Sequence, residues 1–190
     1  MTRCPGRYAV PLRIALCVFP LPVHAAGCKD ATPTSWDIVV APKSERGERL
    51  FVRGRVLSRA DRSHLAGITV YAYHADSTGN YQLPGHENEP PRLCGILRTN
   101  EKGEYRLETS MPGSYDGLPH IHFEIWGPYV SRQYTFVGLK RESLTMDTAH
   151  AVPRPDPPAL RDVRMGLTRP VYRGAGGVLQ CTRDLEVVVK

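Results

Sequence analysis

The stretch Leu118-Pro-His-Ile-His-Phe-Glu-Ile-Trp126 alternates polar and apolar side chains from its first histidine onward. A period of two is typical of a half-buried β-strand, because successive side chains of a strand point to opposite faces of the sheet. His120 and His122 therefore point to one side, together with Glu124. Two imidazoles on one strand supply half of a metal site, provided that other ligands converge on them.

The same alternation recurs on both sides of this stretch. It predicts further strands over residues 50–57, 67–73, 95–99, 104–109, 133–139 and 179–189. The turn signal Asn100-Glu-Lys-Gly103 predicts that strands 95–99 and 104–109 form a hairpin. A polar segment (27–46) precedes the first strand, and residues 151–158 form a proline-rich loop. Six or more short strands with Gly/Pro turns favour an all-β fold, a single-domain β-sandwich with long connecting loops.

The N-terminus has the features of a signal peptide over residues 1–26. Three arginines precede the apolar run 14–23, and small residues follow it. The run is much shorter than the roughly 20 residues that span a membrane, so no membrane span is expected. We therefore expect an exported protein, periplasmic or extracellular, whose domain covers residues 27–190. The sequence Ala25-Ala-Gly-Cys28 loosely resembles a lipobox, and lipid anchoring through Cys28 is an alternative.

Composition argues against a nucleic-acid partner. The three arginines of residues 1–26 supply half of the formal net charge of +6, and no basic stripe with interleaved aromatic residues remains. Cys28, Cys94 and Cys181 lie outside the leading segment. This odd number permits one disulfide in an oxidising compartment and leaves one thiol, with the pairing open.

Two tyrosines are candidates to complete the metal site. Tyr81 follows turn residues 77–80 on the loop that leaves strand 67–73, and Tyr115 follows the turn 111–114 just ahead of the histidines. Two phenolates and two imidazoles form a hard, anionic ligand set that favours Fe(III) over divalent zinc, copper or magnesium. A trivalent ion also lowers the pKa of tyrosine effectively from its usual value of about 10.

At these residues the chain resembles the intradiol ring-cleavage dioxygenases, non-haem Fe(III) enzymes that open catechols. The resemblance covers roughly residues 45–139. It is carried by Tyr73–Tyr81, Gly95–Thr109, Pro112–Tyr115, Pro119–Phe123 and Gln133–Phe136.

The resemblance implies a fold, a cofactor and a reaction. The fold would be the β-sandwich of the aromatic-compound-dioxygenase (prealbumin-like) type. The ferric iron would be held by Tyr81, Tyr115, His120 and His122. The enzyme would insert both atoms of O2 into a small aromatic diol and give a cis,cis-muconate-type diacid. Tyr115 would also be catalytic, by taking a proton from the substrate.

The chain departs from the family pattern near the histidines. Gly117 stands where the family usually has an arginine, and Cys94 replaces the arginine that often precedes Gly95. We therefore expect Arg98 and Gln133 to reach the site from other strands as catalytic groups. Tyr73 and Gln133 are the expected substrate-binding residues.

Two other functions stay open at this stage. One is a cupin-like metal enzyme that uses Glu124, for which a further histidine is needed and only His150, in a polar loop, is available. The other is a non-catalytic transthyretin-like or carboxypeptidase-regulatory-like β-sandwich that binds a carbohydrate or a protein. His64, His74 and His86 follow no pattern and are expected on the surface. A homo-oligomer is an open alternative to a monomer.

Overall fold

The computed structural model describes residues 28–114, 118–145 and 167–190. Within these ranges the protein is all-β, with two short 3-10 helices and no α-helix. The helices are η1 (Cys28–Asp30) and η3 (Ala175–Gly177). The strands are β1 (Asp37–Val39), β2 (Arg49–Ser58), β3 (Thr69–His74), β4 (Leu93–Arg98), β5 (Glu104–Ser110), β6 (His120–Gly127), β7 (Val130–Thr145), β8 (Thr168–Arg173), β9 (Leu179–Thr182) and β10 (Leu185–Val187).

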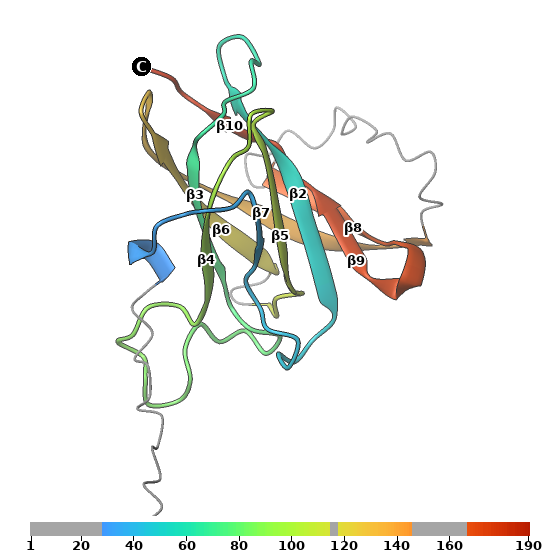
Figure 1. Ribbon diagram of the computed structural model, residues 1–190. Helices are drawn as coiled ribbons and strands as arrows, with labels where there is room; N and C mark the ends of the chain where they lie inside the picture. The colour runs from blue at the N-terminus through green and yellow to red at the C-terminus, as the bar shows by residue number, and fades with distance from the viewer. Residues whose placement is uncertain (1–27, 115–117, 146–166) are drawn as a thin grey trace, which may run out of the picture.

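The strands follow one continuous hydrogen-bonded order, β1-β5-β2-β9-β8-β7-β6-β3-β4, and β10 also pairs with β2. The two ends of this order meet, because the Arg98 amide at the end of β4 donates to the carbonyl of Ser35, just before β1. Figure 1 shows the resulting curved sheet, which nearly closes into a barrel. The predicted all-β class is confirmed, whereas the division into two packed sheets stays a prediction.

The predicted hairpin of strands 95–99 and 104–109 is wrong. β4 pairs with β3, and β5 pairs with β2 and β1. The turn itself forms, since the backbone amide of Gly103 donates a hydrogen bond to the Asn100 carbonyl. The strands separate because the segment leading into β1 lies between them, where Ser35 accepts from β4 and Trp36 accepts from the Arg106 amide of β5.

The closing strand predicted over 179–189 divides into β9 and β10. Both strands pair with β2 in parallel. The break between β9 and β10 falls at Arg183, whose carbonyl packs against β2 at Gly54. A Cβ on Gly54 would lie 1.9 Å from that oxygen, so only glycine fits there. β8 was not predicted, and the polar segment 27–46 contains η1 and β1.

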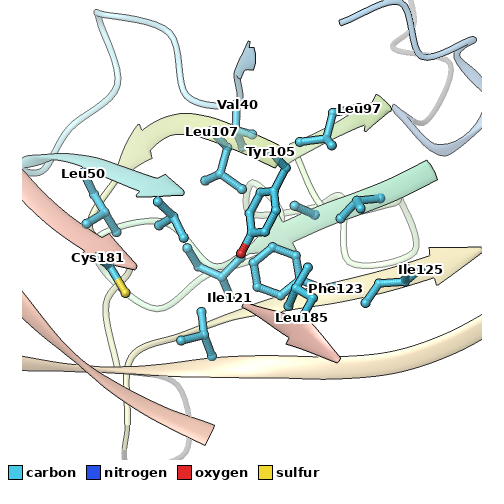
Figure 2. Packing of buried hydrophobic residues seen from close by; sticks show 14 of the residues in the cluster. Val40, Leu50, Leu97, Tyr105, Leu107, Ile121, Phe123, Ile125, Cys181 and Leu185 are labelled. Carbon is cyan, nitrogen blue, oxygen red and sulfur yellow. The ribbon is translucent and has the colours of Figure 1, made fainter. Parts of the chain in front are cut away.

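The core lies inside the curved sheet. It consists of inward-facing apolar residues that alternate with outward-facing ones along each strand. Figure 2 shows Tyr105 of β5 directed at Phe123 of β6, and their rings meet edge to face with centroids 6.0 Å apart. The buried Tyr105 hydroxyl donates to the Arg183 carbonyl at 2.6 Å, so the polar end of this side chain is satisfied.

One disulfide joins the chain near its described start to β4. Cys28 and Cys94, 66 residues apart in sequence, are bonded, and Cys181 is a free, buried thiol. The bond holds η1 beside β4, at the left of Figure 1. The structure thereby gives the pairing that the sequence left open. None of the described helices is long and apolar enough to cross a membrane.

Candidate metal centre

Three predicted ligand atoms converge at one end of β6. The Nε2 atoms of His120 and His122 are 3.0 Å apart, and Tyr81 Oη lies 3.3 Å from the first and 3.1 Å from the second. Two donor atoms that each lie about 2.1 Å from one ion, at a right angle, are themselves about 3.0 Å apart. The three atoms therefore form a triangle whose size is compatible with one bound metal ion.

Both imidazoles direct Nε2 at this triangle. His120 Nδ1 lies 2.8 Å from the Leu118 carbonyl, a contact that fixes the ring orientation and in the neutral ring places the lone pair on Nε2. Burial and the adjacent His120 lower the pKa of His122 to about 4, so its ring is neutral at physiological pH. A neutral imidazole is the form that binds metals.

Aromatic rings hold His122 in place. Tyr73, which faces His122 across the β3–β6 pair, stacks on its ring with centroids 4.8 Å apart and 13° between the planes. Phe136 faces it from β7, with its centroid at 6.5 Å. Tyr73 thus lines the predicted site and packs directly against a ligand candidate.

The loop that carries Tyr81 is built around Asp76. Its carboxylate accepts hydrogen bonds from the Thr78 amide and hydroxyl and from the Asn80 amide, at 2.9, 2.7 and 3.0 Å. Burial raises the pKa of Asp76, but these hydrogen bonds and one from Arg92 outweigh it and bring the pKa down to about 2. Asp76 is therefore charged at all ordinary pH values and holds the turn before Tyr81.

Arg92 fixes this loop from the other side. Its guanidinium donates to both oxygens of Glu45 at 2.6 and 2.9 Å and to Asp76 at 3.0 Å, and its amide donates to the Tyr81 carbonyl. Sequence reasoning missed Arg92 and Glu45. They are 47 residues apart, and no local pattern marks such an ion pair.

Tyr115, the fourth predicted ligand, lies outside the described residues. The turn that precedes it packs against the Tyr81 loop, since the Gly113 amide donates to the Asp76 carbonyl at 2.7 Å. A Cβ on Gly113 would lie 2.6 Å from both the Gly79 nitrogen and the Ser77 carbonyl oxygen. This close backbone approach explains the glycine in the predicted Pro-Gly-Ser turn.

The structure does not bring Arg98 and Gln133 to the histidines. Arg98 pairs with Thr69 at the far end of β4, where its Nε donates to the Gly67 carbonyl at 3.2 Å. Gln133 pairs with Ile125 in the strand register, so its side chain points to the opposite side of the sheet from that of His122. Its side-chain amide donates to the Val188 carbonyl and accepts from the Val188 backbone amide. The prediction that Arg98 and Gln133 reach the site is therefore wrong, because the strand register places both side chains away from the histidines.

Glu124, the carboxylate of the cupin-like alternative, is occupied elsewhere. It is buried and forms ion pairs with Lys29 of η1 at 2.8 Å and Arg132 at 3.1 Å. The described residues contain no group of three or more histidine, cysteine, aspartate and glutamate side chains able to hold a metal. Among the described side chains, Tyr81 therefore supplies the oxygen that lies beside the histidine pair.

The family model described as Dioxygenase matches residues 24–154, more than half of the chain. This chain belongs to the intradiol ring-cleavage dioxygenase family. It was not assigned to the transthyretin-like or carboxypeptidase-regulatory-like families, which were the alternative. No curated protein sequence matches the chain.

Solved structures of dioxygenases have a similar fold. Catechol 1,2-dioxygenase from Acinetobacter sp. ADP1 is 17% identical with a TM-score of 0.60, over 84% of this chain and 59% of that one. The dioxygenase domain of a dioxygenase carbohydrate-binding protein fusion from Streptomyces sp. SirexAA-E is 25% identical (TM-score 0.56), over 84% and 93%. An intradiol ring-cleavage dioxygenase from Tetranychus urticae is 20% identical (TM-score 0.57), over 82% and 86%. The chain thus spans less than two thirds of the Acinetobacter enzyme's length but most of the other two.

Proposed function

We propose that this protein is a non-haem Fe(III) intradiol dioxygenase that inserts both atoms of O2 into a catechol-type ring, giving a cis,cis-muconate-type diacid. The observation that carries the proposal is the triangle of Tyr81 Oη, His120 Nε2 and His122 Nε2, with sides of 3.0 to 3.3 Å. A phenolate beside two neutral imidazoles suits a hard trivalent ion. Family membership supports the same reaction.

Each ligand candidate would have a defined role around the iron. Tyr81, His120 and His122 would bind it, and Tyr115 would supply a second phenolate and accept a proton from the substrate. When bound, the ferric ion would bind the catechol oxygens and make the ring reactive toward O2. The hydrogen bond from His120 Nδ1 to Leu118 would keep the Nε2 lone pair directed at the ion.

The surrounding residues would keep the site rigid and partly dry. Tyr73 stacks on His122, and it would thereby limit both rotation of this ring and access of water from that side. Asp76 and Arg92 would hold the Tyr81 loop at a fixed distance from β6. Preorganised ligands of this kind reduce the rearrangement needed when the substrate binds.

We further propose that the protein is exported. The signal-like segment 1–26 and the disulfide between Cys28 and Cys94 support an oxidising compartment. The same bond uses the Cys28 sulfur that lipid attachment would need, which favours a form without a lipid anchor.

Oxygen uptake by the iron-loaded protein tests the proposal. Catechol, hydroxyquinol and protocatechuate serve as a panel, and mass spectrometry after reaction in 18O2 identifies the product. We expect two labelled oxygen atoms in a ring-opened diacid from at least one of them. Tyr81→Phe should abolish uptake, whereas Tyr134→Phe, which changes an exposed tyrosine, should not. Absence of uptake with every diol would instead favour a binding module.

A further inference from the structure

A cavity of about 370 Å³ lies between β7, β8 and β10, on the other side of β6 and β7 from the histidines. Ile125 and Thr135 line it, and their strand positions alternate with those of His122 and Phe136. The cavity is therefore separate from the candidate metal centre, and its volume lies within the range of small-molecule sites, about 300–1,000 Å³.

Arg183 is the unusual residue of this cavity. Its side chain lines the space but is only 9% exposed, and its buried Nε has no hydrogen-bond partner. Arginine is almost never buried unless it is paired, because removing an unpaired charge from water is costly. Burial and the nearby Arg169 both lower the pKa of Arg183.

The acidic residues of the cavity are bonded to other groups. Glu186 raises the pKa of Arg183, which places its charge nearby, but its carboxylate is ion-paired with Arg62. Asp184 accepts the backbone amide of Arg55 at 2.9 Å. Within the described part of the chain, no carboxylate forms an ion pair with Arg183.

We propose that Arg183 forms a binding site for a small organic carboxylate in this cavity. A guanidinium offers a planar pair of donors that matches a carboxylate, and the pairing would neutralise the buried charge. Ile125 and Val187 also line the cavity and suit the hydrocarbon part of such a ligand. The inference does not depend on ring cleavage.

Isothermal titration of the full-length, iron-loaded protein with benzoate tests this site, with inorganic phosphate as a second titrant. We expect benzoate to bind the wild type and His122→Ala alike, even if this variant, which lacks a proposed iron ligand, holds no iron, since the ligand would not sit on the metal. Arg183→Met should weaken binding by about tenfold or more, the typical effect of losing a charged hydrogen bond. Arg53→Met removes an exposed arginine outside the cavity and is the matched control, for which we expect no change.

Several results would overturn the proposal. These are no benzoate binding by the wild type, loss of binding in His122→Ala, equal affinity in Arg183→Met, or binding of phosphate alone. Without anion, Arg183→Met should unfold at the same or a higher temperature than the wild type, because it removes an unpaired buried charge. If this variant does not fold, Arg183→Lys serves instead. Its amine lacks the planar pair of donors, so unchanged benzoate affinity would contradict the site.

Discussion

His74 follows Tyr73 at the end of β3 and is 1% exposed. Its Nδ1 donates to the Ala75 carbonyl at 2.7 Å, so its Nε2 accepts from the Thr109 hydroxyl at 2.6 Å. Thr109→Val keeps the shape and leaves Nε2 without a donor, which should lower the free energy of unfolding by about 1–3 kcal/mol. Denaturant titration measures this. Thr182→Val, at an exposed position, should change stability by less than about 0.5 kcal/mol.

The same imidazole gives a pH dependence. Burial lowers the pKa of His74 from 6.5 to about 4, so the unfolded chain takes up this proton at a higher pH than the folded protein. The stabilising contribution is fully present above pH 6.5 and is lost as the pH falls toward 4. The wild type should therefore lose more stability than His74→Gln between pH 7 and pH 4.5. Equal losses in the two proteins would contradict this account.

At the level of single residues, the sequence predicts which side chains converge at the candidate site better than it predicts the residues that support them. His120 and His122 follow from a period of two on one strand, and the structure brings Tyr81 to them. His74 was expected on the surface and is buried, because the donor that satisfies it, Thr109, lies on another strand. Such pairing depends on strand register, which no local pattern encodes.

Among the connecting elements, the contact of Gly113 with the Tyr81 loop leaves no room for added volume. Gly113→Ala would place a Cβ 2.6 Å from two backbone atoms and force the turn before Tyr115 away from that loop. We expect weaker iron binding, by about tenfold or more, and a loss of stability of about 1–3 kcal/mol. Competition with a chelator measures the affinity.

Gly85→Ala is the control for this experiment. Gly85 has a φ of +84°, so alanine is strained there, but a Cβ would meet nothing within 4 Å. Its stability should fall by only about 1 kcal/mol, with iron affinity unchanged. If both variants bound iron as the wild type does, the contact at Gly113 would not position the site.

At the level of strands, composition and alternation predicted where strands form better than they predicted which strands pair. The strands around residues 50–57, 67–73 and 104–109 form nearly as expected. The hairpin of β4 and β5 failed because the segment before β1, which is polar and was assigned no strand, occupies the space between them. β8 has Pro170 in its centre, a residue that argues against a strand in sequence reasoning.

For the molecule as a whole, the disulfide is the longest covalent constraint described. It closes a loop between Cys28 and Cys94, 66 residues apart. The Cys28→Ser/Cys94→Ser variant should lose about 2–4 kcal/mol of stability, because the unfolded chain regains freedom. Thermal or denaturant unfolding measures the loss. Reduced wild type should behave like this variant, and Cys181→Ala should keep the bond. Equal stability of oxidised and reduced wild type would mean that the bond does not form.

The central claim is that Tyr81, His120 and His122 bind one ferric ion, and the visible absorption spectrum of the iron-reconstituted protein tests it most directly. A phenolate bound to Fe(III) gives a charge-transfer band, so the wild type should be red-brown. The band should weaken and shift in Tyr81→Phe and stay unchanged in Tyr134→Phe. A wild type without a visible band, or a Tyr81→Phe variant with the wild-type spectrum, would contradict the site.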